Sequence, residues 1–130
     1  MAALHRAHAM GLIDASLATT TLTASTGPIK CRLYTVVGTA STAGTEVSGG
    51  SYASVTVTFS ASTNADPPVA VSNVLASYTN MPACTVVAVE LFDSYSTPHR
   101  LWWGNLAASK VLNSGDTFQI ASGSLTCSLA

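Results

Sequence analysis

A pair of adjacent glycines that leads directly into an alternating segment is the feature that most restricts the fold. Gly49 and Gly50 permit positive φ at no steric cost, so they predict a tight connection or a bulge just before strand pairing begins. In the segment that follows, the apolar residues Val55, Val57 and Phe59 share one face, and hydroxyl side chains share the other. This alternation predicts a half-buried β-strand.

Other short segments with strand patterns are spread along the chain, with turn signals between them. Residues 85–92 are almost continuously apolar or β-branched, which predicts a core strand covered on both faces. A change of apolar phase across Gly123 predicts a bulge or kink between the last two strands. The pattern indicates an all-β fold, an antiparallel β-sandwich of jelly-roll or Ig-like form. The predicted strands are 29–37, 52–59, 69–74, 75–78, 85–92, 100–103 (ending at Gly104-Asn105), 117–120 and 125–129, and residues 109–112 lead into a turn.

Residues 1–28 have a different character from the predicted sandwich domain, residues 29–130. Apolar residues between positions 2 and 22 can be arranged on one face of a helix, but the Thr-rich run at 19–23 favours an extended chain. The segment therefore has two alternative interpretations. It is a short helix that caps an edge of the sheet, or it is an arm that reaches a neighbouring subunit. The residues on the helical face are Leu4, Ala9, Met10, Leu12, Ile13 and Leu17.

The chain is poor in charge and rich in hydroxyl groups. Charged residues make up 8% of the sequence, whereas Ser and Thr supply 34 of its 130 positions. Small soluble domains usually carry about 25–35% charged residues on the surface for solubility. We therefore expect a subunit that is covered by neighbours in an assembly; the alternative is a secreted β-domain with an ordinary Ser/Thr surface.

Several classes of function have no support in the sequence. The five Lys and Arg residues are scattered, so no basic stripe for nucleic acid is expected. Neither a membrane span nor a cofactor or metal motif is present, and the segment 10–18 is interrupted by Asp14 as a signal peptide would not be. The three cysteines, Cys31, Cys84 and Cys127, are expected to be buried free thiols, with one disulfide between strands as the alternative.

Catalysis is not expected. Ser94, His99 and Asp93 supply the residue types of a hydrolytic triad, but no strained G-x-S-x-G turn accompanies them. Glu90 and Asp93 are the only close carboxylate pair, and His99 beside Arg100 is expected to be a solvated loop pair. The protein is therefore predicted not to be an enzyme.

Two adjacent tryptophans, Trp102 and Trp103, are the remaining feature. Neighbouring residues of a strand point to opposite faces, so one ring is expected in the core and the other is pushed outward, where it is partly covered, stacks on a sugar or anchors an interface. The candidate interface residues are Leu12, Ile13, Leu17, Leu22, Trp102 and Trp103.

A series of motifs also carries a family resemblance. They are, in chain order, Leu33-Tyr34-Thr35, residues 44–53, Val57-Thr58-Phe59, Asn73, residues 86–93, Trp102-Trp103-Gly104, residues 115–120, Gly123 and Leu125. This series resembles a group of small tailed-phage virion proteins that are tail-fibre-like and in some phages decorate the head as cement proteins. The resemblance covers residues 29–130. Where these relatives commonly have Arg after Tyr-Ala, this chain has Ser54, so a contact made by that arginine is absent.

The resemblance implies a β-sandwich without catalysis that is present in many copies on the virion, and it leaves head and tail open. Our leading hypothesis is a head decoration protein, a dimer or trimer that binds the major capsid protein and copies of itself. Residues 1–24 are then the arm or edge helix that reaches a neighbour. The alternatives are a tail-associated or fibre-base protein and a carbohydrate-binding adhesion module.

Overall fold

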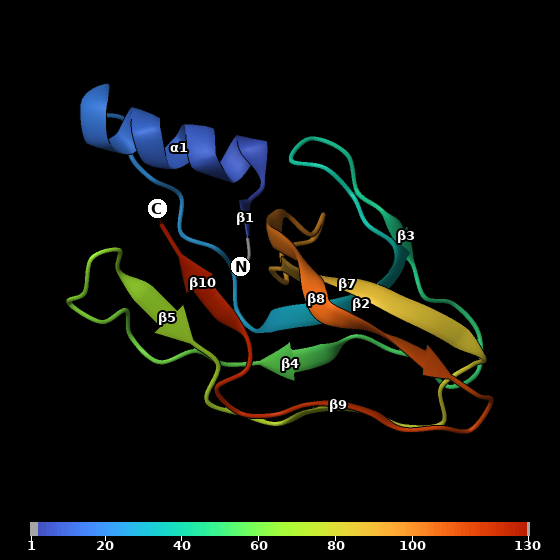
Figure 1. Cartoon of the computed structure of the whole chain (residues 1–130). Coiled ribbons are helices and arrows are strands. Elements are labelled where there is room, and N and C mark those ends of the chain that lie inside the picture. Colours follow the sequence, from blue (N-terminus) through green and yellow to red (C-terminus); the bar gives the residue numbers. More distant parts are fainter. Residues whose placement is uncertain (1–2, 130) are drawn as a thin grey trace.

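The computed structural model describes residues 3–129 and has an antiparallel all-β fold with a short N-terminal helix, as predicted (Figure 1). The elements are β1 (Ala3–Leu4), α1 (Arg6–Leu17), β2 (Ile29–Val36), β3 (Thr45–Glu46), β4 (Val55–Val57), β5 (Val69–Val71), β6 (Ala76–Tyr78), β7 (Cys84–Phe92), β8 (Arg100–Leu112), β9 (Phe118–Ile120) and β10 (Thr126–Ser128).

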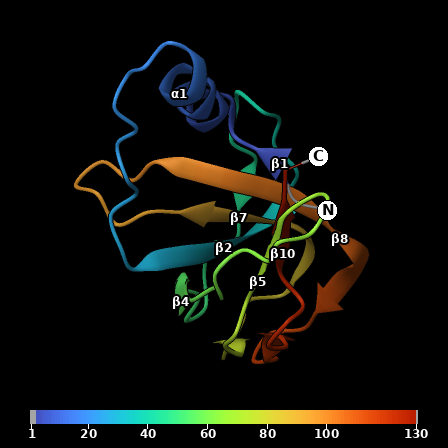
Figure 2. The ribbon, with the colours of Figure 1, turned by 90° about the vertical axis from the view of Figure 1, so that its left-hand side faces the viewer.

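The main sheet has six strands. Its order is β1-β8-β7-β2, and β3 and β4 pair with different halves of the far edge of β2. Two short ladders, β5 with β10 and β6 with β9, lie apart from this sheet. Figure 2 shows α1 on one side of the sheet, next to β8. The strands β5 and β10 run across the direction of β8, β7 and β2.

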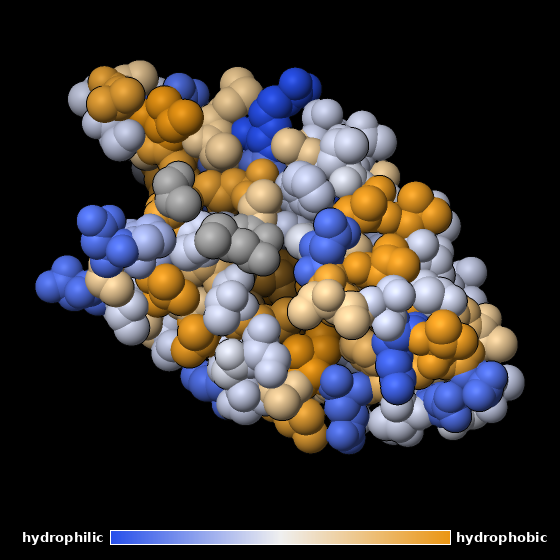
Figure 3. Space-filling model, in the orientation of Figure 1, coloured by the Kyte–Doolittle hydropathy of each residue, from blue (hydrophilic) through white to orange (hydrophobic). Residues whose placement is uncertain are grey.

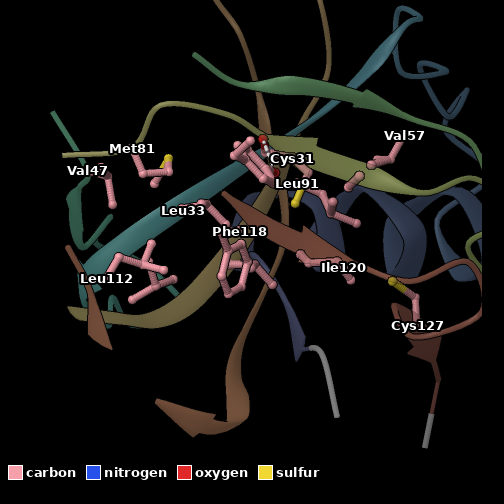
Figure 4. Close-up of a cluster of buried hydrophobic side chains, with 14 residues drawn as sticks. Cys31, Leu33, Val47, Val57, Met81, Leu91, Leu112, Phe118, Ile120 and Cys127 are labelled. Carbon is pink, nitrogen blue, oxygen red and sulfur yellow. Dashed lines mark hydrogen bonds between the residues drawn. The ribbon is translucent and has the colours of Figure 1, made fainter. Parts of the chain in front are cut away.

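The main core lies between the six-stranded sheet and the two ladders. Leu33 and Val57 of the sheet meet Ile120 and Cys127 of the ladders in one buried cluster (Figure 4). Each of these side chains alternates with a more exposed neighbour on its strand, so the pattern of residue types fixes which face is buried. The sandwich architecture follows from this packing of two layers.

The strand β7 lies in the middle of the sheet and is covered on both faces. Val89 and Leu91 belong to the main core, whereas Ala88 and Phe92 join Tyr34 in a second, smaller cluster on the opposite face. The predicted core strand is therefore confirmed.

The two glycine predictions are also confirmed. Gly49 and Gly50 have φ of 97° and 56°, and a Cβ on Gly50 would lie 2.9 Å from the carbonyl oxygen of Asn80. Gly123, between β9 and β10, has φ of 85°.

The largest error in a predicted boundary concerns β8. The segment Arg100–Leu112 is a single strand of 13 residues, and it does not end near Gly104. A register shift opposite Val86 and Ala88 of β7 accommodates the small residues in its middle. Their weak strand propensity concealed a strand that pairing with β7 holds in place.

Two smaller differences concern segment ends. Leu4 pairs in β1 and does not lie on the helix, and β4 ends at Val57, with Phe59 forming an isolated bridge to Ser72. The N-terminal segment contains the expected helix, and the irregular linker that follows it, residues 18–28, is held on the body of the same chain.

Candidate functional site

The N-terminal unit, defined here as β1, α1 and the linker 18–28, is attached to the sheet mainly through its backbone. Ala3 and Leu4 pair with Trp103 and Trp102 at the edge of β8. The next two amide groups continue this attachment, because His5 N donates to the Leu101 carbonyl at 2.9 Å and Arg6 N to the Ala40 carbonyl at 2.8 Å. The start of α1 is thereby fixed on the body.

The helix itself buries very little. None of its twelve residues, all of which belong to the described part of the chain, is buried. Met10, Ile13 and Leu17 are exposed by 56%, 57% and 81%. In Figure 3 hydrophobic atoms gather over the end of α1 that is distant from β1. An isolated helix of this length is only marginally stable in water and usually depends on tertiary packing. The exposed apolar side chains of α1 are therefore unusual for a subunit that is not part of an assembly.

The opposite face of α1 is turned to the body and is half-buried. It carries His8, Gly11, Leu12 and Ala15. Leu22 of the linker folds back beneath the helix, where its Cδ1 lies 3.7 Å from the position of a Cβ on Gly11. The linker is held farther on by Ser94 N, which donates to the Thr26 carbonyl at 2.7 Å.

A cavity of about 730 Å³ lies between this face of α1, the linker and the turn from β7 to β8. A smaller and more apolar cavity of about 290 Å³ adjoins it and shares His8, Ser25 and Leu101 with it. The histidines and the acidic and basic residues around the larger cavity are His5, His8, Asp14, Asp93, His99 and Arg100.

Asp93 organises the floor of this cavity. Its carboxylate accepts hydrogen bonds from the backbone and the ring of His99, with the ring Nδ1 at 2.8 Å, and from the amides of Tyr95 and Thr26. Burial alone raises the pKa of Asp93, but these hydrogen bonds outweigh it and lower the pKa below its usual value. The Tyr95 ring stacks on the His99 ring at a centroid distance of 4.9 Å.

The three residue types of a hydrolytic triad are therefore not assembled as one. Asp93 and His99 are paired, but the Ser94 hydroxyl donates to the Pro28 carbonyl. The structure thus uses Ser94 to hold the linker.

Arg100 is not the solvated loop residue that the sequence suggested, whereas the ring of His99 is 56% exposed. The guanidinium of Arg100 is buried against Glu90, and it also donates to the Thr39 carbonyl in the loop that receives α1. The signal that could have revealed this pair is Glu90 itself, because a carboxylate inside an apolar core strand requires a partner.

The two tryptophans point to opposite faces, as expected, and both are half-buried. Trp102 packs against the main core and lines the smaller cavity. The Trp103 ring lies 5.7 Å from the Arg100 guanidinium, and its buried Nε1 has no hydrogen-bond partner within residues 3–129. Of the six candidate interface residues, Ile13, Leu17 and Leu22 are thus exposed, whereas Leu12 and the tryptophans are partly covered.

Two features are absent from residues 3–129. No group of His, Cys, Asp and Glu side chains there could hold a metal ion. No helix in this range is both long and apolar enough to cross a bilayer.

The fold and the exposed helix define a small β-sandwich module with a candidate interface at its N-terminal end. The family described as Podophage GP4 fiber I protein gp80 matches residues 3–128, and the chain belongs to this family. It is therefore a phage structural protein, related to fibre proteins and located in the virion. No curated protein matches the chain.

Proposed function

We propose that this protein is a non-catalytic fibre-type subunit that decorates the phage head. It contacts the major capsid protein and copies of itself, and the N-terminal unit is its attachment surface. The observation that carries the proposal is the exposure of Met10, Ile13 and Leu17 on a helix that buries no side chain. Such a surface is stable where a neighbour covers it.

The low charge of the chain supports the same proposal. Only 8% of its residues are charged, which suits a surface that is covered in an assembly better than one kept in solution. A subunit that binds only the assembled shell stabilises that shell by mass action. Each bound copy then raises the free energy needed to release a capsid subunit.

The contacts of Asp93 and Ser94 beside the larger cavity also support a structural role. The Asp93 carboxylate is occupied by its hydrogen bonds to the turn, and the Ser94 hydroxyl is occupied by Pro28. These groups hold the linker and the turn in position, which an attachment surface requires.

The test compares virions with and without this protein. Heating both should release DNA at a lower temperature from particles that lack it, and gold labelling of the protein should mark the head. Equal release temperatures would argue against a cement role.

A tail position is the second candidate, and the word "fiber" in the description of the family supports it. Label at the tail, with none on the head, would establish this alternative. The carbohydrate-binding candidate has weaker support, because Trp102 and Trp103 are both half-buried. It requires glycan binding that weakens on Trp102→Ala or Trp103→Ala.

A further inference from the structure

The outer face of α1 carries an apolar stripe, defined as Met10, Ile13 and Leu17. Because an α-helix turns by about 100° per residue, these three side chains lie within an arc of about 60°. The half-buried residues His8, Leu12 and Ala15 lie on the opposite side. The stripe therefore points away from the body of the protein.

The spacing of the stripe is that of a helix-pairing seam. Steps of three and four residues separate Met10, Ile13 and Leu17, which matches the a and d positions of a coiled coil. Arg6 lies four residues before Met10 in the same seam and is exposed. Asp14, also exposed, flanks the stripe.

The charged side chains of Arg6 and Asp14 favour a second copy of α1 as the partner, in the antiparallel direction. In a parallel pair of these helices Arg6 would face Arg6 in the same layer, which is repulsive. In an antiparallel pair, Met10 faces Ile13 of the second copy and Arg6 faces Leu17 of the second copy. The Arg6 stem then covers that leucine, and its guanidinium reaches Asp14 one turn away.

We propose that the stripe binds the same stripe of a second copy of this chain, with the two helices antiparallel and Arg6 of each copy paired with Asp14 of the other. The arrangement is self-complementary, as a two-fold interface must be. Both bodies lie outside the helix pair, because each stripe faces away from its own body. The inference deepens the proposed function, since it names the copy-to-copy contact of the attachment surface.

A contact of one short helix with another is small compared with a standard interface of about 800 Å² per partner. It therefore forms at high protein concentration and strengthens where many copies are held on one particle.

The first experiment is sedimentation of the purified full chain over a concentration series. We expect reversible dimers in the wild type and a dissociation constant at least about tenfold higher for Ile13→Ser, which corresponds to about 1.4 kcal/mol. The control is Val111→Ser on β8, where the aliphatic side chain is also exposed, by 69%, and lies outside the stripe. Circular dichroism of each variant checks that it is folded.

The second experiment tests the direction of pairing by charge exchange. Arg6→Glu and Asp14→Lys should each weaken the dimer by about tenfold, and the double variant should restore it. A wild type that stays monomeric, a dimer that is indifferent to Ile13→Ser, or a double variant without rescue would each overturn the proposal.

These measurements use no virions, so their failure is separate from failure of the proposed function. A chain that dimerises through the stripe but is not found on the head supports the inference and removes the head role. A monomeric chain that still decorates the head supports the head role and overturns the helix-pairing inference.

Discussion

Arg100 and Glu90 form a two-point ion pair in the interior, with Arg100 Nε donating to Glu90 Oε2 at 2.7 Å and a second hydrogen bond joining the other ends of the two groups. Both side chains are almost completely buried. The same guanidinium donates to the Thr39 carbonyl, and the neighbouring Ala40 carbonyl receives the Arg6 amide at the start of α1. The ion pair thus supports the loop on which the N-terminal unit rests.

Removing one member of this pair should be costly. Arg100→Met leaves the Glu90 carboxylate buried without a partner, which we expect to lower the free energy of unfolding by about 3–5 kcal/mol. Urea denaturation measures this loss. The control is Arg32→Met, which breaks the more exposed 3.6 Å pair with Glu46 and should cost about 1 kcal/mol. If both variants lost the same free energy of unfolding, the buried pair would contribute no more to stability than the exposed pair.

Gly44 is the glycine that the packing constrains most. A Cβ at this position would lie 1.9 Å from the Val36 carbonyl oxygen, so Gly44→Ala must displace backbone in the loop that receives α1. We expect a loss of about 3 kcal/mol in thermal or urea unfolding. Gly27→Ala is the matched control, because within residues 3–129 no atom beyond the two chain neighbours lies within 4 Å of its added methyl group. A Gly44→Ala variant as stable as this control would contradict the geometry.

Acidification should loosen the N-terminal unit. Burial lowers the pKa of His8 below the ordinary value of 6.5, and the Asp93 carboxylate opposes this shift only in part. Burial and the Arg100 charge lower the pKa of His5, with Glu90 acting in the opposite direction. Docking thus favours neutral imidazoles, so its stability is present above about pH 6.5 and is lost as the pH falls through the lowered values.

Hydrogen exchange at the Arg6 amide, which donates to Ala40, measures this loosening. Corrected for the intrinsic rate, protection should fall between about pH 7.5 and about pH 5. The Leu33 amide, bonded to the Tyr52 hydroxyl within the body, provides the internal control. His8→Gln should flatten the pH dependence. If Arg6 and Leu33 change in parallel, the effect is not specific to the N-terminal unit.

The three cysteines, which are free thiols in the structure, should differ in reactivity. Burial raises the pKa of Cys31 and Cys127 to about 11, whereas Cys84 is half-buried and its pKa is raised less. Alkylation near neutral pH, followed by mass spectrometry, should therefore label Cys84 first. All three should react after denaturation. A chain that takes up only one label when unfolded would contain a disulfide instead.

The patterns along the chain determined the sandwich, the core strand 85–92 and the glycine turn at Gly49-Gly50, and they left an N-terminal helix and an extended arm as alternatives. Each of these depends on local spacing, because a period of two or 3.6 residues and a positive φ are properties of neighbouring positions. The low charge and the motif series likewise indicated a virion subunit.

Only the tertiary structure decided that Arg100 is buried, that β8 continues to Leu112 and that Met10, Ile13 and Leu17 face outward. These outcomes depend on strand register and on which side of α1 meets the body. Glu90 in an apolar strand signals that a partner is needed, but it does not say which residue supplies it. Glu90 and Arg100 meet because β7 and β8 pair with a shift between Leu91 and Phe92. The long-range pairing of backbone groups, rather than the preference of any single residue, placed these side chains together.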